Sequence, residues 1–257
     1  MTALFNDIIF GPVRSRRLGL SLGVNLLPTH SKLCNFDCIY CECGWNADNR
    51  GSGRFNERKD VVGQLEATLA DMSRSRELPD VITFAGNGEP TLHPEFELII
   101  NDTLALRDEY APKAKVSVLT NATMLHREDV VRALKRVDNN ILKIDSAIDS
   151  TARIMNNPSS PTYSVERVAA QIKSFEGGQI VQTMFLRGEY NGVVIDNTTP
   201  REVDAWVNMI ERISPRMVML YSIDRNTPCS TLCKVDKSEL MAISAKIEAL
   251  GIETSIA

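Results

Sequence analysis

Short apolar runs alternate with longer amphipathic segments along most of the chain. Six of these runs have the length and composition of buried strands, and they lie at residues 22–27, 81–85, 115–119, 141–145, 180–186 and 217–223. A further short run, at 252–256, is expected to form a terminal strand. Because strands separated by helices favour parallel pairing with helical crossovers, the pattern predicts an α/β fold.

The intervening segments carry apolar residues at helical spacing. One stripe is formed by Val165, Val168, Ala169, Ile172 and Phe175, and a second by Val203, Trp206, Val207, Ile210 and Ile213. The run Thr199-Pro200-Arg201-Glu202 predicts a capping box with proline at the first helical position. Asp236 and Glu239 are expected to cap the last helix, and the glycine- and asparagine-rich residues 46–53 are expected to form a loop that can cover a site.

Composition narrows the class of protein. The 257 residues are 43% hydrophobic and 24% charged, which is typical of one globular domain over residues 1–257, with residues 1–21 packing on it. No apolar run approaches the roughly 20 residues that span a bilayer, and no secretory signal pattern precedes the first strand. We therefore expect a cytoplasmic protein with reduced thiols and no membrane partner. The net charge of −4 weakens bulk nucleic-acid binding without excluding a local basic patch.

Three cysteines follow the first predicted strand in the run C-N-F-D-C-I-Y-C. Cys34, Cys38 and Cys41 lie within eight residues, so three thiolates can hold three irons of a cubic [4Fe–4S] cluster and leave the fourth iron open. A Cys₃His zinc site that includes His30 is an alternative. A disulfide framework is disfavoured in a long chain without a secretory signal.

The spacing C-x-x-x-C-x-Φ-C, with Tyr40 just before the last cysteine, resembles the signature of the radical S-adenosylmethionine (SAM) superfamily. The resemblance extends from about Phe10 to the end of the chain. It implies an open partial (β/α)₆ barrel of the TIM type, which matches the six predicted strand–helix units. It also implies that SAM chelates the open iron and is cleaved reductively to methionine and a 5′-deoxyadenosyl radical.

The run Gly86-Asn87-Gly88-Glu89-Pro90 directly follows the predicted strand 81–85. Active residues of barrels lie at the carboxyl ends of strands. The run resembles the G-x-G-E-P segment that binds SAM in the superfamily, where Gly86 and Gly88 would allow close approach and Glu89 would accept hydrogen bonds from the methionyl ammonium. The alternative is a turn that only ends a strand.

Further polar residues end the next strands. By the same resemblance, Asn121 would hold the ribose or the methionyl carboxylate, Asp145 the ribose hydroxyls, and Tyr40 would lie beside the adenine. Lys143 shares one strand face with Asp145, so it can pair with a carboxylate, form an imine with a carbonyl substrate, or simply pair with Asp145. Arg187 can clamp a carboxylate or be a solvated loop residue.

The segment F-G-P-V-R-S-R-R-L-G-L-S-L-G at residues 10–23 resembles the start of a superfamily branch related to the wyosine-base synthases of tRNA modification. The runs N-L-L-P, G-N-G-E-P-T-L-H-P and D-R-N-T-P also fit that branch, but its extra cysteines upstream of the main motif are missing. Arg14, Arg16, Arg17 and Lys32 can form an anion site or brace the segment against acidic partners.

The remaining cysteines are Cys43, Cys229 and Cys233. Cys43 follows the three-cysteine run by two residues, and Cys229 and Cys233 follow the sixth predicted strand. The two segments are expected to meet at the same mouth of the barrel. Together they can hold a second iron–sulfur cluster; a disulfide, a reactive thiol or plain packing are the alternatives. His93 and His126 are interpreted as structural.

The sequence thus predicts an enzyme whose radical abstracts hydrogen from an unidentified substrate, which can be a small molecule, a peptide or tRNA. A reducing protein such as flavodoxin or ferredoxin is the expected partner. The alternatives are a wyosine-like tRNA-modifying enzyme, an activating enzyme that places a glycyl radical on a partner protein, and a metal-binding module without catalysis.

Overall fold

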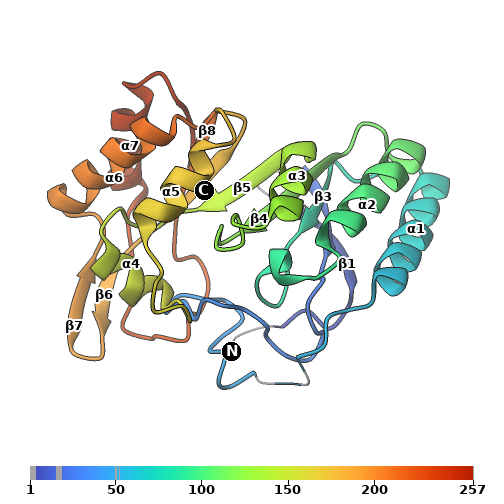
Figure 1. Ribbon diagram of the computed structural model, residues 1–257, viewed down its shortest axis with the longest axis horizontal. Coiled ribbons are helices and arrows are strands. Elements are labelled where there is room, and N and C mark those ends of the chain that lie inside the picture. Colours follow the sequence, from blue (N-terminus) through green and yellow to red (C-terminus); the bar gives the residue numbers. More distant parts are fainter. Residues whose placement is uncertain (1–3, 16–18, 50, 52, 257) are drawn as a thin grey trace.

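An open, curved sheet organises the computed structural model, which describes residues 4–15, 19–49, 51 and 53–256 (Figure 1). Seven parallel strands are neighbours in the order β2 (Gly19–Val24), β3 (Val81–Phe84), β4 (Lys115–Thr120), β5 (Asn139–Lys143), β6 (Ile180–Tyr190), β8 (Met217–Ser222) and β10 (Glu253–Ile256). The fold is a partial barrel of the TIM type, as the strand count predicts.

Helices cover the outside of the sheet. They are α1 (Arg58–Ser75), the 3₁₀ turn η1 (Pro90–Leu92), α2 (Phe96–Tyr110), α3 (Glu128–Arg136), α4 (Asp149–Asn156), α5 (Val165–Lys173), α6 (Pro200–Ile213) and α7 (Lys237–Glu248). Figure 1 shows α1, α2 and α3 grouped on one side of the molecule and α5, α6 and α7 on the other. The main core lies between these helices and the sheet, where Phe84, Phe96, Phe185 and Trp206 are almost fully buried.

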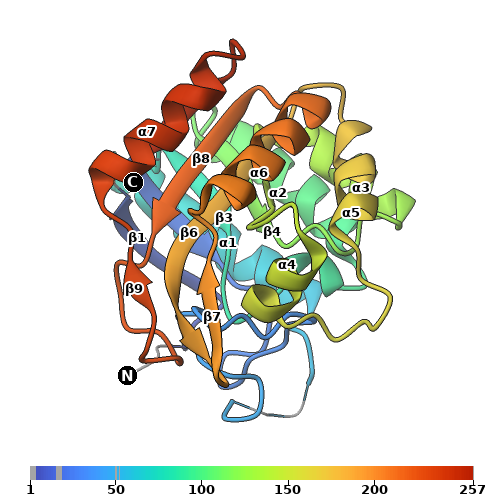
Figure 2. The ribbon, with the colours of Figure 1, turned by 90° about the vertical axis from the view of Figure 1, so that its left-hand side faces the viewer.

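Three strands were not predicted, and all of them pair antiparallel. β1 (Ile9–Ser15) pairs with β2 at the edge of the sheet, whereas β7 (Val193–Asp196) and β9 (Cys233–Lys234) pair with the distal part of β6 (Figure 2). β6 therefore continues four residues beyond the predicted end at residue 186. The sequence there is polar and contains Gly188, so the extension depends on backbone pairing with its neighbours and not on an apolar run.

The inner face of the sheet changes character along its strands. Ile141, Ile180 and Met219 form a small apolar cluster with Leu119 and Met217 on β4, β5, β6 and β8. Polar side chains follow on the same strands nearer their carboxyl ends, where Lys143, Gln182 and Tyr221 line a cavity. The barrel interior is thus closed at one end and polar at the other, and the site is built at the polar end.

The predicted helix caps are formed only in part. Thr199 accepts a hydrogen bond from the backbone N–H of Glu202 at 3.4 Å, but the Glu202 carboxylate turns to Ser146, at 2.7 Å, instead of closing the capping box. Asp236 occupies the N-cap position of α7 without a side-chain capping bond, and Glu239 accepts a bond from Arg187. Glu202 and Glu239 therefore bind side chains from distant segments and do not cap their own helices.

His93 is structural, as expected, and gives a pH-dependent stability. Its Nε2 lies 2.9 Å from the carbonyl oxygen of Asn56, its Nδ1 accepts the N–H of Glu95 at 3.0 Å, and burial lowers the pKa of the ring. The unfolded chain therefore takes up this proton first as the pH falls. We expect the free energy of unfolding to decrease from about pH 6.5 downward, toward the lower pKa of the folded state. Urea titrations of wild type and His93→Gln between about pH 7.5 and about pH 5 should show a shallower decrease in the variant; the exposed His126→Gln should behave as wild type.

Candidate active site

The three cysteines of the C-N-F-D-C-I-Y-C run line one cavity of about 410 Å³ at the carboxyl ends of the strands. Their loop is tied to the end of α4, because the N–H of Ile39 donates to the carbonyl of Met155 at 3.0 Å. Within the loop, the Asn46 amide donates to the carbonyls of Cys34 and Phe36 at 3.2 and 3.0 Å. The backbone that presents Cys34, Cys38 and Cys41 is therefore held from both sides.

This donor set fits a cubic iron–sulfur cluster better than a single metal ion. Among the described residues, no group of three or more His, Cys, Asp or Glu side chains converges closely enough to hold one ion. A cube takes its thiolates at separate corners, so its ligands stand farther apart than those of one tetrahedral zinc. His30 is exposed and does not line the cavity, so the Cys₃His zinc alternative has no fourth ligand.

The three thiols of the cysteine loop differ in pKa. Burial raises the pKa of Cys34 well above its ordinary value and that of Cys38 to about 12. A hydrogen bond from the Cys43 thiol, helped by the positive charge of Lys32, instead lowers the pKa of Cys41 to about 6. Thiolate ligands in this loop therefore depend on nearby positive charge, which bound iron would also supply.

Lys32 is a buried cation next to the cysteine loop. Its side chain is 1% exposed, and its Nζ donates to the carbonyl of Gly44 at 2.6 Å and to Asp37 at 3.2 Å. Burial acts to lower its pKa, but the negative charges of Cys41, Cys34 and Asp37 outweigh that effect and raise the pKa. Lys32 therefore stays positively charged beside the thiolates. This charge would stabilise the reduced, more negative state of a cluster bound there.

That charge gives a prediction for Lys32→Met. We expect the reconstituted variant to have a lower reduction potential than wild type, because the cation that stabilises the more negative reduced cluster is lost. A redox titration followed by electron paramagnetic resonance measures this potential. Lys32→Arg, which keeps the charge, should stay closer to wild type; equal potentials in Lys32→Met and wild type would contradict the role.

The Gly86–Pro90 run is packed against the cysteine loop. Gly88 forms a parallel bridge with Leu33, and a Cβ at Gly88 would stand 1.9 Å from the Leu33 carbonyl oxygen. The Gly88 φ of +142° also disfavours any other residue. Glycine is therefore required here for the two motifs to meet.

Glu89 is buried at the cavity wall. Its Oε1 accepts hydrogen bonds from the N–H of Thr91 at 3.0 Å, from the Thr91 hydroxyl at 2.5 Å and from the Thr120 hydroxyl at 2.7 Å. Among the described residues, its Oε2 accepts a single bond, from the N–H of Asn121 at 2.6 Å. Burial raises the pKa of Glu89 despite these donors. The carboxylate is therefore rigidly placed, with acceptor capacity left on Oε2.

Asn121 also lines the cavity, but its side chain braces the loop. Its Nδ2 donates to Asn35 Oδ1 at 2.7 Å and lies 3.9 Å from the Cys34 sulfur, and its Oδ1 accepts the N–H of Thr123 at 3.1 Å. The amide thus positions the segment that carries Cys34.

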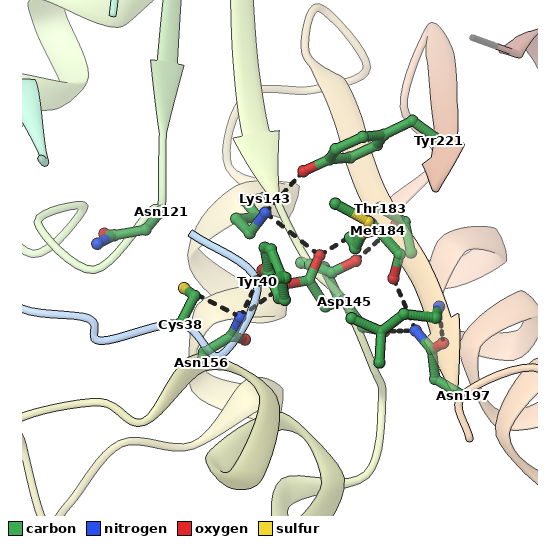
Figure 3. A network of polar contacts seen from close by, with 12 residues as sticks. Cys38, Tyr40, Asn121, Lys143, Asp145, Asn156, Thr183, Met184, Asn197 and Tyr221 are labelled. Carbon is green, nitrogen blue, oxygen red and sulfur yellow. Dashed lines mark hydrogen bonds and ion pairs between the residues drawn. The ribbon is translucent and has the colours of Figure 1, made fainter. Parts of the chain in front are cut away.

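Lys143 and Asp145 belong to a buried polar network that includes Tyr40, Asn156 and Tyr221 (Figure 3). The Lys143 ammonium donates to the Tyr221 hydroxyl at 2.9 Å, pairs with Asp145 at 3.5 Å and stands 4.7 Å from the centre of the Tyr40 ring. Burial alone would lower the pKa of Lys143, but Asp145 and Tyr221 outweigh it and raise the pKa. An imine requires a neutral amine, so this network favours the ion-pair alternative for Lys143.

The predicted role of Asp145 at a ribose stays a prediction, and the contacts of Asp145 do not favour it. Asp145 is buried and is not among the cavity residues. Its Oδ2 accepts bonds from the Tyr40 hydroxyl and from Asn156 at 2.6 Å, and its Oδ1 accepts the N–H of Met184 at 3.0 Å. With its oxygens engaged inside the protein, Asp145 positions Tyr40 and Lys143.

The predicted carboxylate clamp at Arg187 also stays a prediction that the contacts of Arg187 do not favour. Arg187 pairs with Asp196 at 3.5 Å and with Glu239, and it donates to the Thr198 hydroxyl. It does not line the cavity. These partners, from β7 and the start of α7, make Arg187 a structural brace at the distal part of β6.

The second set of cysteines is not gathered at the cavity. Cys43 is buried with its sulfur 3.6 Å from the carbonyl of Gly86, Cys229 is buried 3.1 Å from the Thr231 hydroxyl, and Cys233 is exposed on β9. None of them lines the cavity, and all six cysteines are free, which excludes the disulfide alternative in this structure.

The predicted anion site of Arg14, Arg16, Arg17 and Lys32 lies only partly within the described residues, so it stays a prediction. Arg14 is exposed on β1, whereas Lys32 is buried in the cysteine loop. Arg16 and Arg17 lie outside the described residues.

Several cavity residues were missed by sequence reasoning. Tyr221 and Gln182 lie within the predicted strands 217–223 and 180–186, and the composition of those runs does not indicate that their side chains line the cavity. Glu42 and Arg225 form an ion pair of 2.7 Å between the cysteine loop and the segment after β8, and both line the cavity. Only the alternation of β6 and β8, which places Gln182 and Tyr221 on inward-facing positions, carried a signal for these residues.

The family model of the radical SAM superfamily matches residues 29–203, which include the three cysteines, Glu89, Lys143 and Asp145. The chain belongs to the radical SAM superfamily. Membership supports a [4Fe–4S] cluster and SAM as cofactors, and the superfamily requires a reductant. No helix in the described part of this radical SAM protein is long and apolar enough to cross a membrane.

Curated relatives are mostly proteins of the group called UPF0026. This chain is 29% identical over 252 residues to one from Helicobacter pylori strain J99, which covers 95% of this chain and 75% of that protein. It is 32% identical over 183 residues to one from Methanocaldococcus jannaschii, covering 70% of this chain and 54% of that protein. A Brachyspira hyodysenteriae protein named GTPase Obg is 26% identical over 223 residues, which cover 85% of this chain and 30% of that protein. The chain thus spans about half or less of the length of two of these relatives.

Solved radical SAM structures share the fold. A radical SAM methyltransferase from Sphaerobacter thermophilus superposes with a TM-score of 0.69 at 13% identity, covering 92% of this chain and 65% of that one. A structure of TYW1 with a lysine–pyruvate adduct bound superposes with a TM-score of 0.58 at 12% identity, covering 89% and 73%. At these identities the likeness supports the architecture only.

Proposed function

We propose that this protein is a radical SAM enzyme in which Cys34, Cys38 and Cys41 hold a [4Fe–4S] cluster and SAM binds in the adjoining cavity. When bound, the reduced cluster and SAM supply a 5′-deoxyadenosyl radical that abstracts hydrogen from the substrate. The observation that carries this proposal is the convergence of the three thiols, without a fourth cysteine, on a cavity that extends past Glu89 to Lys143.

Glu89 is the residue best placed to bind a cationic group of SAM. It is a buried carboxylate whose Oε2 accepts one hydrogen bond from within the described part of the chain. A buried anion is stabilised by a paired cation, and an ammonium group supplies both charge and N–H donors. Thr91 and Thr120 fix the orientation of the carboxylate before the ligand arrives.

Other residues shield or shape the cavity. The Tyr40 ring, held by its hydroxyl on Asp145, gives a flat surface on which an adenine can lie. The Glu42–Arg225 pair joins the cysteine loop to the segment after β8 at the edge of the cavity.

The proposal is tested on protein purified and reconstituted without oxygen. With SAM and dithionite, chromatography should detect 5′-deoxyadenosine, and flavodoxin or ferredoxin with its reductase should replace dithionite as the electron donor. A cluster that forms at four irons per chain without any 5′-deoxyadenosine would instead favour the metal-binding module without catalysis.

A tRNA substrate is the second candidate, favoured by the F-G-P-V-R-S-R-R-L-G run that resembles the wyosine-related branch. This candidate requires salt-dependent affinity for tRNA. A filter-binding titration at low salt tests it, and no retention of tRNA would remove this candidate while leaving the radical SAM proposal intact. A glycyl-radical activating role has no separate support in the described residues.

A second iron–sulfur cluster at Cys43, Cys229 and Cys233 stays a prediction from the sequence. The burial of Cys43 and Cys229 away from the cavity leads us to expect that it does not form. Iron and sulfide are counted in the Cys34/Cys38/Cys41 triple-alanine variant after reconstitution. We expect background values; stoichiometric iron and sulfide with a cluster spectrum would establish a second cluster.

A further inference from the structure

The inner face of β5 and β6 places a cation and an amide side by side at the floor of the cavity. Lys143 and Gln182 are directly opposite each other in the β5–β6 register, and both line the cavity. The residues two positions earlier, Ile141 and Ile180, belong to the apolar cluster below. The change from apolar to polar therefore occurs on both strands at the level where the cavity begins.

Gln182 has no role within the folded chain that explains its amide. The residue is only 8% exposed, yet its side chain makes no hydrogen bond within the described part of the chain. Its neighbour Thr183 faces the opposite side of the sheet, where its hydroxyl binds the carbonyl of Ile144 at 2.6 Å and the indole of Trp206 at 3.1 Å. The amide atoms of Gln182 are not among the fully buried polar atoms that lack a partner, so the amide is accessible from the cavity that Gln182 lines. The Gln182 amide is thus available to a molecule in the cavity.

Lys143 supplies the charge beside this amide. Its side chain is 16% exposed, and it stays protonated because Asp145 and Tyr221 raise its pKa. Asp145 divides its hydrogen bonds among Tyr40, Asn156 and the backbone of Met184, so it neutralises Lys143 only in part. An ammonium group has three N–H donors, which leaves Lys143 able to donate to a ligand as well.

From this arrangement we infer that Lys143 and Gln182 form a subsite for a carboxylate group of the substrate, a ligand separate from SAM. The inference rests on the proposed function, because it assumes that SAM occupies the part of the cavity near the cysteines and Glu89. Two adjacent donors, one charged and one neutral, match the two oxygens of a carboxylate. Among the described residues that line the cavity, the arginine is Arg225, which is paired with Glu42, so within this part of the chain no arginine fork for phosphate lies beside Lys143.

The test is a calorimetric titration of cluster-loaded enzyme saturated with SAM. The probes are pyruvate, succinate and benzoate, each compared with its neutral amide, and methyl phosphate. We expect at least one carboxylate to bind about tenfold or more tightly than its amide. Lys143→Met and Gln182→Leu should each weaken that binding by about tenfold. Lys113→Met, at an exposed position between α2 and β4, is the matched control and should bind as wild type.

Three results would overturn the inference: no carboxylate binding to wild type, preference for methyl phosphate, or binding unaffected by either cavity variant. A fourth result would also overturn it: Lys143→Met weakens the binding of SAM but not the binding of decarboxylated SAM. In that case Lys143 binds the carboxylate of SAM itself and not that of a substrate. Gln182→Leu keeps the Lys143–Asp145 pair, so it remains informative if Lys143→Met does not fold, which circular dichroism checks. No reductant is added, so carboxylate binding can succeed even if 5′-deoxyadenosine is never formed.

Discussion

Replacing Cys38 by alanine is expected to abolish both the cluster and SAM cleavage. The thiols of Cys34, Cys38 and Cys41 line the same cavity, and two cysteines cannot hold a cube that needs three protein ligands. Iron and sulfide should fall to background after anaerobic reconstitution, the broad absorption of the cluster should disappear, and 5′-deoxyadenosine should be undetectable.

Cys233→Ala is the matched control for this experiment. Cys233 is exposed on β9 and does not line the cavity, so its loss should leave the iron content and product formation unchanged. Circular dichroism and thermal melting separate loss of the ligand from loss of the fold. If Cys38→Ala kept four irons per chain and still cleaved SAM, the assignment of the cluster ligands would be incorrect.

Glu89→Gln is expected to weaken SAM binding by about tenfold to hundredfold, because a neutral amide cannot pair with an ammonium group in a buried site. The substitution also sets an amide NH₂ or carbonyl where Oε1 and Oε2 accept bonds from Thr91, Thr120 and Asn121. One of these donors would lose its acceptor, so a lower melting temperature is expected as well.

Equilibrium binding of SAM to the cluster-loaded variant measures the effect, and iron content shows whether the cluster is intact. Glu128→Gln, on the exposed start of α3, changes the same net charge at a distance from the cavity and should bind SAM as wild type. Unchanged SAM affinity in Glu89→Gln with an intact fold would mean that Glu89 only supports the Thr91–Thr120 contacts.

The parts of the molecule that could be predicted from sequence are those encoded by neighbouring residues. The apolar runs gave the parallel strands, because a strand buried on both faces is continuous in hydrophobicity. Cys34, Cys38 and Cys41 lie within one loop, and Gly86–Pro90 directly follows β3. In these cases spacing along the chain already fixes which groups meet.

Sequence reasoning was least informative where the partners of a residue come from distant segments. Arg187 and Asp145 have the composition of ligand-binding residues, but Arg187 is taken up by Asp196 and Glu239, and Asp145 by Tyr40 and Asn156. Sequence periodicity gives the face of a strand on which a side chain lies, but not which donors reach it there. The antiparallel additions β1, β7 and β9 were missed for the same reason, since they depend on pairing and not on a distinctive apolar run.

The anchoring of the cysteine loop bears on when iron can be loaded. The loop rests on Met155 and on Asn156, which donates to Tyr40 and lies 3.6 Å from the Cys38 sulfur, and on the Gly86–Gly88 backbone that bridges Leu33. The residues that make these contacts are synthesised after the cysteines, and those of α4 come more than a hundred residues later. During translation the thiols therefore emerge before the framework that orients them, so we expect a cluster to be bound by a largely folded domain and not by the nascent chain.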